Sequence, residues 1–448
     1  MATGTPRSPQ KNIRSNAESV LLSYPGKKSV EEVLATPPGI FEYAPTIGSN
    51  LRKRLYFAEN LETLAHLAQD NNVCGKVRLV YIDPPYATQT VFHSRTLSHA
   101  YEDVFECAEY LEFIRERLIL LHRILADDGS IYIHLDAKMV FHVKLLMDEI
   151  FGLSNFRNCI TRKKSNPKNY TRNQFGNISD YILFYTKSSQ YVWNKQCEPW
   201  TEERAREYQY VEPETGRRYM KVPIHAPGVR NGETGKQWRG MMPPLGKHWQ
   251  FLPSTLDELD AKGEIYWSKN GNPRRKVYLD ENHGVSVQDI WLDYRDAHNQ
   301  MAHITGYPTE KNINLLKRII EASSNVGDIV LDCFAGSGTT LVAADMLGRA
   351  WIGSDNSPEA LRTMLHRFQH GTKPMGDFVG VQTYKQKVKA LSLFDEELPQ
   401  AVKNDKTHII QGFNLFADPK LGGLLTLDET SAHDKQEIKT VEKVRKTG

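Results

Sequence analysis

Blocks of apolar and polar positions alternate along two stretches of this chain in the way that α/β proteins require. Residues 77–83 form a short apolar run of strand length that stops at two prolines, and residues 110–125 place leucine and isoleucine at spacings of three and four, as on one buried helix face. A strand over 130–135 and a helix over 137–151, ended by Gly152, come next. This order of strand, helix, strand and helix predicts a parallel sheet covered by helices.

The same alternation returns in the second half of the chain, after an interruption. Helical spacing over 310–322 precedes an apolar run at 329–333, a glycine-rich segment, a helical pattern at 341–347 and a strand at 349–354. Between the two stretches, residues 157 to about 290 are crowded with turn-forming dipeptides and contain or adjoin six of the seven tryptophans. We expect an irregular, β-rich module inserted between two α/β halves.

Composition narrows the class of protein. The 448 residues are 40% hydrophobic and 25% charged, which excludes collagen, a coiled coil or disorder throughout. Lys and Arg number 57 against 54 Asp and Glu, a formal net charge of +3 that also excludes a histone-like binder. The charge is unevenly distributed, because residues 157–249 hold 17 basic and 8 acidic side chains and the rest of the chain holds 40 and 46. The first part of the insertion therefore favours a polyanionic partner.

Cysteine usage and the termini indicate a compartment. The five cysteines include no C-x-x-C pair and are odd in number, which favours reduced thiols over disulfides or a zinc site, so no metal is expected. Residues 1–16 are polar and lack the apolar core of a secretory signal, and no run of about 18 apolar residues occurs. We expect a cytoplasmic protein with no membrane partner.

The glycine-rich segment between the strands at 329–333 and 349–354 indicates a ligand site. Gly336 and Gly338 let the backbone approach a ligand, and the helix that follows favours a negative group. No lysine follows Gly338 as a P-loop requires, and Leu341 stands where a dinucleotide fingerprint has its third glycine. S-adenosylmethionine carries a carboxylate and a ribose diol, and Asp355 supplies the acid that such a diol needs. The alternative is a tight turn without a ligand.

The sequence Asp83-Pro84-Pro85-Tyr86 ends the predicted strand at 77–83. The prolines fix an extended backbone and remove two N–H donors, so the site is rich in acceptors. Hydrogen bonds from an exocyclic amine to the Asp83 carboxylate and the Pro84 carbonyl would move its nitrogen toward tetrahedral geometry, and its lone pair could then attack a sulfonium methyl in line. Tyr86 could stack against a base that has left its duplex. The alternative is a strand end capped by a proline turn, with Asp83 solvated.

Together these motifs resemble the amino-methyltransferases of DNA that act on adenine N6 or cytosine N4. The catalytic motif comes first and the cofactor loop last, as in the circularly permuted β arrangement of many type II enzymes and of type III modification subunits, and the resemblance covers roughly residues 50–375. It is carried further by the stretches 55–61, 128–136, 148–158, 307–312 and 347–353. It implies a Rossmann-like S-adenosylmethionine-dependent methyltransferase fold with a catalytic half (51–156), a basic loop and target-recognition domain (157–300) and a cofactor-binding half (301–380). Composition adds an N-terminal arm (1–50), whose first 28 residues are polar, basic and expected to be loose, and a C-terminal extension (381–448).

The resemblance also implies a role for each motif residue. It assigns the cofactor's methionine part and adenosine to Phe334, Ala335, Gly336, Ser337 and Gly338, its ribose hydroxyls to Asp355, the pocket's flanks to Thr309 and Lys311, and the target amine to Asp83, Pro84, Pro85 and Tyr86. Cys333 stands where the family often has proline, and Asn312 where proline commonly follows lysine, so we expect a different loop shape with the chemistry kept. Asp83 in place of serine favours adenine over cytosine. No cysteine follows a proline, which excludes C5 methylation.

Six basic side chains and no acidic one lie between residues 157 and 179, interleaved with Tyr170 and Phe175. The tryptophan-rich module is predicted to recognise the target, the alternative being a folded insertion with a tryptophan core. His134 and Asp136 end a strand of the same sheet and are expected to be structural or on the cofactor side rather than catalytic. We predict that the basic loop contacts DNA phosphates, the alternative being a solvated loop, through Arg162, Lys163, Lys164, Lys168 and Arg172.

The sequence thus predicts a site-specific enzyme that methylates adenine N6 in duplex DNA by base flipping and direct in-line attack. A cytosine-N4 enzyme, a non-catalytic DNA-binding subunit that keeps the fold, and a methyltransferase of RNA or of a protein amide are the alternatives. Double-stranded DNA is the expected partner, in the nucleoid of a prokaryotic cytoplasm. A second copy of the chain and a restriction endonuclease remain open as further partners.

Overall fold

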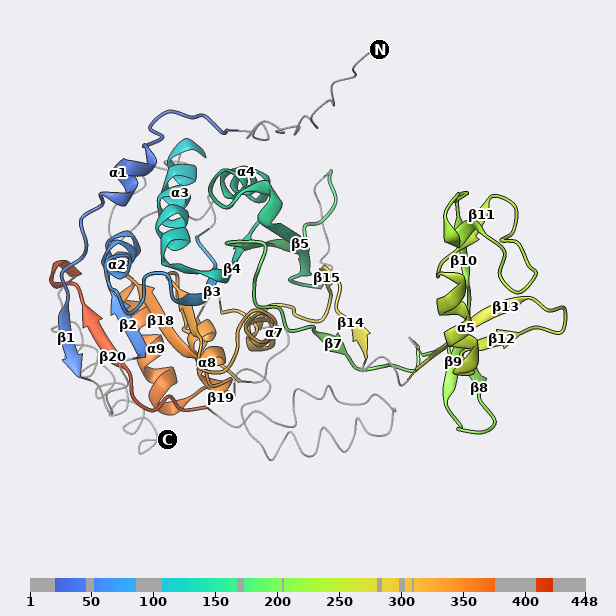
Figure 1. Cartoon of the computed structure of the whole chain (residues 1–448). Helices are drawn as coiled ribbons and strands as arrows, with labels where there is room; N and C mark the ends of the chain where they lie inside the picture. The colour runs from blue at the N-terminus through green and yellow to red at the C-terminus, as the bar shows by residue number, and fades with distance from the viewer. Residues whose placement is uncertain are drawn as a thin grey trace, which may run out of the picture. The chain divides into compact units, whose positions relative to one another are not determined.

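The structure, a computed structural model, describes residues 21–45, 52–85, 107–166, 173–203, 205–279, 284–297, 303–307, 310–374 and 408–421. The chain divides into two compact units (Figure 1). Unit 1 is made of residues 1–194 and 289–448, and unit 2 is made of residues 195–288. No helix among the described residues is both long and apolar enough to cross a membrane.

Unit 1 is built on one mixed sheet of ten strands. Its six consecutive strands from β20 to β4 run parallel, β15 is parallel to β5, and the antiparallel pairs are β4 with β6, β6 with β5 and β1 with β20. In spatial order the strands are β1 (Glu42–Pro45), β20 (Asn414–Ala417), β2 (Lys53–Phe57), β18 (Ala350–Asp355), β17 (Ile329–Asp332), β3 (Val77–Ile82), β4 (Leu125–Leu135), β6 (Ser179–Thr186), β5 (Phe156–Lys163) and β15 (Ile290–Trp291).

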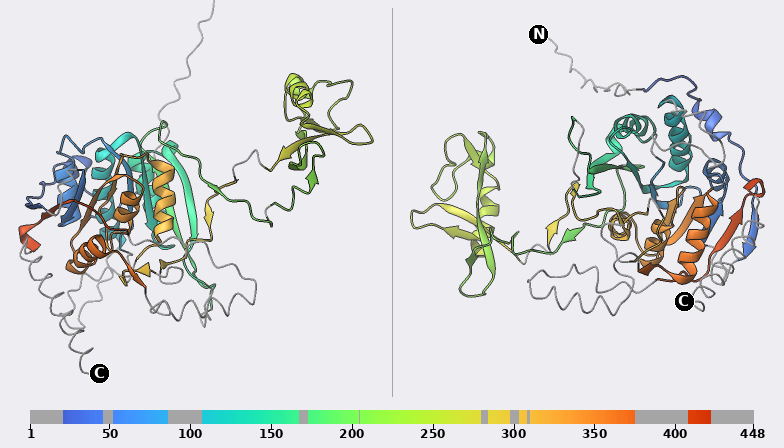
Figure 2. Two further views of the ribbon diagram at one scale, coloured as in Figure 1. Left: turned by 90° about the horizontal axis from the view of Figure 1, so that it is seen from below. Right: turned by 180° about the vertical axis from the view of Figure 1, so that it is seen from behind.

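Helices cover both faces of this sheet, with α2, α3 and α4 on one face and α7, α8 and α9 on the other (Figures 1 and 2). The predicted strands and helices of both α/β halves are confirmed. Helix α7 begins three residues later than the spacing predicts, because the Asn312 side chain caps it by accepting the N–H of Asn314. The helices of unit 1 are α1 (Val30–Leu34), α2 (Asn60–Leu67), α3 (Cys107–Ile124), α4 (Val140–Phe151), α7 (Ile313–Ser323), α8 (Thr339–Met346) and α9 (Pro358–His370), with short 3₁₀ turns at Leu153–Asn155 and Pro419–Leu421 and a strand pair β16 (His303–Ile304) and β19 (Lys373–Pro374).

The sheet brings the two predicted motifs together. Strands β17 and β3 are parallel neighbours, with Leu331 beside Val80, although about 250 residues separate them in the chain. All four side chains of β3 from Leu79 to Ile82 are buried, as expected of a strand covered on both faces. The glycine loop after β17 and the Asp-Pro-Pro motif after β3 therefore leave the sheet at the same edge, where doubly wound proteins bind their ligands.

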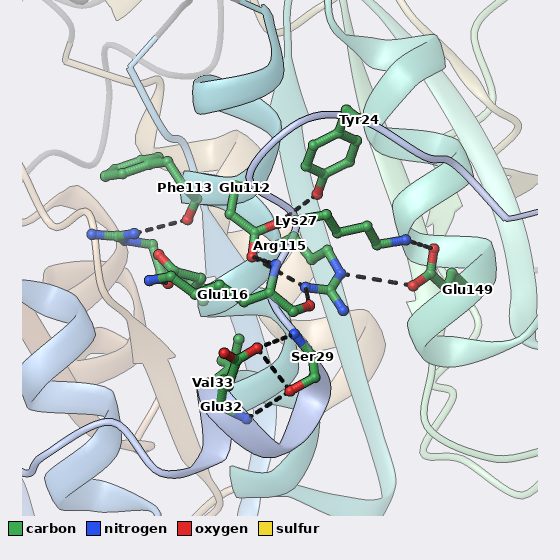
Figure 3. A network of polar contacts seen from close by, with 12 residues as sticks. Tyr24, Lys27, Ser29, Glu32, Val33, Glu112, Phe113, Arg115, Glu116 and Glu149 are labelled. Carbon is green, nitrogen blue, oxygen red and sulfur yellow. Dashed lines mark hydrogen bonds and ion pairs between the residues drawn. The ribbon is translucent and has the colours of Figure 1, made fainter.

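Residues 21–28 of the expected N-terminal arm are not loose but packed against α3 and α4 of unit 1. Tyr24 donates to Glu112 on α3 at 2.7 Å (Figure 3). Arg115 of the same helix donates to the Lys28 carbonyl at 2.9 Å. Lys27 pairs with Glu149 on α4 at 2.7 Å (Figure 3). These contacts join side chains more than 80 positions apart, so no local pattern in the sequence could indicate them.

The predicted boundaries at residues 50, 157, 300 and 381 need correction. Strands β5 and β6 belong to the main sheet, and so do β1 and β20 from the expected arm and extension. The inserted module is therefore narrower than predicted and matches unit 2. The reason is that these strands take their place in the sheet from pairing with neighbouring strands, such as β20 with β2 and β6 with β4, and not from a signal in their own short stretch of sequence.

Unit 2 is β-rich, as predicted. Trp238 and Trp249 pack edge to face at 5.9 Å in a core that includes Leu256 and Ile265, so at least these two tryptophans serve packing. The unit holds a four-stranded sheet in the order β12 (Ile265–Trp267), β13 (Pro273–Tyr278), β9 (Arg218–Pro223) and β8 (Tyr210–Val211), the pairs β10 (His225–Pro227) with β11 (Lys247–Trp249) and β7 (Cys197–Glu198) with β14 (Val285–Ser286), the helix α5 (Pro253–Ala261) and a 3₁₀ turn at Glu233–Gly235.

Candidate active site

The glycine loop after β17 is held to the next strand by Asp355. The backbone N–H of Gly336 donates to one Asp355 oxygen at 2.8 Å, and the N–H of Ser357 donates to the other at 2.9 Å. The loop adopts left-handed backbone conformations at Gly336 (φ 51°) and at Gly338 (φ 71°), which explains glycine at both positions. Asp355 therefore shapes the loop, in addition to lying where a ligand would meet it.

The two glycines have different neighbours. A Cβ at Gly338 would lie 2.9 Å from Met364 Cγ and 3.2 Å from Phe368 Cε1, both on α9, so this glycine is required for close packing. A Cβ at Gly336 would meet Tyr307 at 3.5 Å, an ordinary contact, at the wall of a cavity. Of the two, it is Gly336 that borders the space open to a ligand.

That cavity has a volume of about 320 Å³ and lies at the carboxyl edge of the central strands. Both predicted motifs contribute to its wall, together with the start of α2 and the segment before α7. Its lining residues are Glu59, Asn60, Asp83, Pro84, Pro85, Phe113, Tyr307, Lys311, Cys333, Phe334, Gly336, Asp355 and Asn356.

The two carboxylate oxygens of Asp83 have different surroundings. Lys311 Nζ lies 2.8 Å from Oδ2 in an ion pair whose side chains are 14% and 18% exposed. Oδ1 is buried and has no hydrogen-bond partner among the described residues, and His134 Nδ1 lies 3.9 Å from it. A buried carboxylate oxygen without a donor is costly. Asp83 therefore presents one fixed oxygen and one acceptor in need of a donor at the wall of the cavity.

On the other side of the cavity, Arg117 of α3 organises the start of α2. Its Nη2 lies 2.6 Å from Glu59 Oε1 and its Nε donates to Asn60 Oδ1 at 2.6 Å. Asn60 in turn donates to the Cys333 carbonyl at 2.9 Å, at the beginning of the glycine loop. The cavity is thus acidic at Glu59, Asp83 and Asp355, a set that suits hydroxyl groups, amines or a cationic ligand.

Comparison with known proteins agrees with this geometry. A model of the DNA methylase family N6_N4_Mtase matches residues 77–366. The chain belongs to this family. It is 46% identical over 407 residues to the type II methyltransferase M.EcaI of Enterobacter cloacae, covering 89% of this chain and 87% of that one.

Two further matches are more distant. The type III enzyme StyLTI Mod subunit of Salmonella typhimurium is 28% identical over 355 residues, which cover 70% of this chain and 52% of that protein, so this methylase spans about half of its length. Among solved structures, the M1.HpyAVI–SAM complex aligns with a TM-score of 0.37 and 18% identity, over 70% of this chain and 98% of that one. The family match and the relatives confirm the predicted resemblance to type II and type III modification methyltransferases, and the helix-covered mixed sheet agrees with the α/β fold expected of that family.

Most of the predicted site residues of this DNA methylase do meet in one place. Asp83, Pro84, Pro85, Lys311, Phe334, Gly336 and Asp355 line the cavity, whereas Ala335, Ser337 and Gly338 adjoin it in the loop. Glu59, Asn60 and Tyr307 also line the cavity and were not predicted, although all three lie in stretches, 55–61 and 307–312, that carry the family resemblance. Four predicted residues fall outside the described part of the chain: Tyr86, Thr309, Lys168 and Arg172.

Arg162 does not have the role that the sequence predicts. It is 1% exposed on β5 and makes two contacts with Asp180, at 2.8 and 2.6 Å, and one with Asp296 at 2.8 Å. A guanidinium so enclosed by carboxylates cannot bind a DNA phosphate. Lys163 and Lys164, which follow it, are only partly buried and remain candidates for that contact.

The loop also holds a carboxyl group with a perturbed acidity. Burial raises the pKa of Asp332, the last residue of β17, to about 7. Its Oδ1 accepts the backbone N–H of Phe334 at 3.0 Å and so helps to shape the loop beside the cavity. Asp332 does not line the cavity, and we therefore regard it as a structural part of the loop.

Proposed function

We propose that this DNA methyltransferase transfers the methyl group of S-adenosylmethionine to the N6 amine of adenine in duplex DNA. The observation that carries the proposal is Asp83, whose buried and unpartnered Oδ1 lies in the same cavity as the glycine loop. An amine N–H is the donor that this oxygen needs. Aspartate at this position, where the cytosine-N4 relatives of this arrangement mostly have serine, supports adenine as the target.

The chemistry of the cavity fits the cofactor. Glu59 and Asp355 supply carboxylate oxygens for ribose hydroxyls, and each Asp355 oxygen, which already accepts one N–H, keeps a second lone pair. Phe334 lies 6.0 Å from Phe113, so two rings border the space for an adenine ring. S-adenosylmethionine supplies an electrophilic methyl group on a sulfonium when it is bound.

The residues of this chain then act by positioning. Lys311 fixes Asp83 through Oδ2, so that Oδ1 points its lone pairs at the incoming amine. Asp83 and the Pro84 carbonyl accept the two N–H bonds and orient the nitrogen for attack. Because the acceptors line a concave cavity, the target base must leave the duplex stack to reach them.

The test of this proposal uses labelled S-adenosylmethionine and mixed-sequence duplex DNA, followed by digestion to nucleosides. We expect N6-methyladenine; N4-methylcytosine in its place would refute the adenine assignment. Asp83→Ala should abolish transfer while cofactor affinity stays within about tenfold, because its hydrogen bonds go to the amine. Asp127→Ala, at a side chain that is 96% exposed, is the matched control and should behave as the native protein. Cofactor binding without transfer by the native protein would support the non-catalytic alternative.

We further propose that unit 2 recognises the target and contacts the DNA backbone through one face of its four-stranded sheet. Residues paired across antiparallel strands share a face. The register aligns Tyr210, Tyr219 and Tyr278 in one row and Lys221 opposite Lys276 in the next row of the same face. Tyr219 and Tyr278 are buried and Lys276 pairs with Glu212 at 2.8 Å, so Lys221 is the member of these two rows that suits a phosphate contact.

The chemistry of the two faces differs. Ile265, on the opposite face, is buried in the same core cluster as Leu256 of α5. On the tyrosine face Arg274 is exposed, and Lys221 Nζ lies 3.4 Å from the centre of the Tyr266 ring. The tyrosine face is therefore the one with cations available to a polyanion.

Lys221→Ala and Arg274→Ala test this surface. Each should weaken DNA binding and lower the slope of log affinity against log salt concentration by about 0.9, the value for a single phosphate that is no longer neutralised. Lys262→Ala, at the exposed end of α5 away from the tyrosine face, is the control. An unchanged slope in both test variants would refute the surface.

The relatives suggest a further partner. Mod subunits are, by their names, parts of type III restriction-modification enzymes. We propose that a restriction endonuclease of the same target sequence accompanies this methyltransferase. DNA from cells that express this chain would then resist that endonuclease, and cleavage at methylated sites would refute the pairing.

A further inference from the structure

A line of buried polar side chains crosses four neighbouring strands and ends beside Asp83. Tyr81 on β3, His134 on β4, Asp180 on β6 and Arg162 on β5 are each no more than 1% exposed. Burial of charged groups is costly unless they are paired, and well-packed apolar residues would serve stability as well or better. This line therefore calls for a role other than stability.

His134 is the member of the line that faces the site. Its Nε2 lies 2.9 Å from Asp180 Oδ2, its Nδ1 lies 2.8 Å from the Tyr81 hydroxyl, and the same Nδ1 lies 3.9 Å from Asp83 Oδ1. The charged groups around it are thus Asp180 from β6, Asp83 after β3, and Lys311, which pairs with Asp83. Burial, helped by Lys311, lowers the pKa of His134, against the opposing effect of the two carboxylates.

A neutral imidazole has one N–H, and its surroundings decide which nitrogen carries it. The Asp180 oxygen lies 2.9 Å from Nε2 without the angle of a regular hydrogen bond, but a carboxylate this close would repel a bare nitrogen lone pair, which assigns the hydrogen to Nε2. Arg162 holds Asp180 through both carboxylate oxygens, so this carboxylate cannot turn away. Nδ1 is then an acceptor, and the Tyr81 hydroxyl donates to it.

We propose that His134 is a positioning residue for Asp83: Asp180 and Arg162 lock its imidazole in the Nε2–H form, so that Nδ1 offers no hydrogen to Asp83 Oδ1 and leaves that oxygen open for the target amine. The inference rests on the proposed function, in which Asp83 accepts the amine. In the other tautomer, or in the imidazolium, a shift of about 1 Å would let Nδ1–H donate to Oδ1 and occupy the acceptor.

The lock predicts effects on the rate of methyl transfer and on its pH dependence. Asp180→Asn places an amide N–H near Nε2 and so permits the wrong tautomer; kcat should fall at least tenfold while the KM for S-adenosylmethionine stays within twofold. In the native protein kcat should fall as the pH is lowered, because protonation of His134 occupies Oδ1. His134→Gln keeps an N–H for Asp180 but cannot titrate, so the fall of kcat at low pH (the acid limb of the pH profile) should be absent in this variant.

The control is Asp296→Asn. Asp296 contacts the same Arg162 at 2.8 Å, and its side chain is 39% exposed. The chemical change is the same as in Asp180→Asn, but it leaves His134 untouched, so kcat and its pH profile should remain native. The proposal is overturned if Asp180→Asn behaves like Asp296→Asn, or if His134→Gln keeps the native acid limb.

A spectroscopic measurement makes the test independent of activity. The imidazole ¹⁵N shifts of His134, assigned by their loss in His134→Gln, should report the Nε2–H tautomer in the native protein and a changed tautomer in Asp180→Asn. Asp83→Ala separates the two levels of the argument. If Asp83→Ala still transfers methyl groups, the proposed function is wrong. If Asp83→Ala is inactive while the His134 and Asp180 variants keep the native rate, pH profile and tautomer, only the proposed role of His134 is wrong.

Discussion

The substitution Gly338→Ala separates packing from ligand binding in the glycine loop. Gly338 has φ 71° and ψ 20°, a left-handed conformation in which a Cβ costs about 1–2 kcal/mol. The added methyl would also lie 2.9 Å from Met364 Cγ and 3.2 Å from Phe368 Cε1. Met364 can adjust, but Phe368 is fully buried against Trp351 and Phe413, and such overpacking costs about 1–3 kcal/mol. The free energy of unfolding should therefore fall by about 2–5 kcal/mol.

Gly336→Ala is the matched comparison, because it adds the same methyl two residues earlier. Its φ is 51° and its nearest neighbour, Tyr307, is 3.5 Å away, so the cost should be the backbone strain of about 1–2 kcal/mol alone. The methyl enters the cavity, however, and should weaken S-adenosylmethionine binding. Urea unfolding followed by circular dichroism and titration calorimetry with the cofactor measure the two effects. A loss below about 1 kcal/mol in Gly338→Ala, or a larger loss in Gly336→Ala, would refute the reasoning.

Three further predictions concern other parts of unit 1. Replacing Lys163 and Lys164 by alanine should lower the salt slope of DNA binding by about 0.9 for each phosphate that these lysines neutralise, and a native slope would exclude them from the interface. Burial raises the pKa of Asp332 to about 7, so the folded protein keeps a proton that the unfolded chain releases near pH 4, and the stability that this proton contributes is lost as the pH rises to about 7. The free energy of urea unfolding of Asp332→Asn should therefore depend less on pH between 5 and 8 than that of the native protein. An unchanged pH dependence would contradict the raised pKa. Tyr24→Phe should lower the free energy of unfolding by about 1 kcal/mol, because it removes the donor to Glu112, and equal stability would show that water replaces the tyrosine hydroxyl.

The elements that the sequence predicts well are those whose signal is local. Strand β3, which ends just before Asp83, and strand β17, which ends at Asp332, are apolar runs with a sharp stop. That both belong to one α/β sheet follows from the order of strands and helices. Strands β1 and β20 pair with each other across more than 350 residues, and neither has a repeating pattern of its own. Their place in the sheet is decided by packing that no short window of sequence contains.

The candidate site was predicted in the same uneven way. The motif residues that form the cavity were found because the chemistry needs particular side chains in particular spacings. Asp180 was missed, because a single aspartate beside a basic segment indicates nothing until β6 pairs with β4 and brings its carboxylate to 2.9 Å from His134 Nε2. The misassignment of Arg162 has the same cause, since its partners lie 18 and 134 positions away.

The contacts of Arg162 and its neighbours change how the excess of basic residues between 157 and 249 is interpreted. Arg157 donates to Thr186 and to the Ser188 carbonyl, and Arg218 donates to backbone carbonyls of unit 2, so both are occupied by the protein itself. With Arg162 enclosed by carboxylates, a count of basic residues overstates the surface that DNA can meet. Among the described residues the accessible cations are therefore fewer than the count suggests, and those that remain, such as Lys163 and Lys164, are the ones that can contact a phosphate backbone. Charge along a sequence therefore indicates that a polyanion binds, whereas the partners of each cation in the fold decide where.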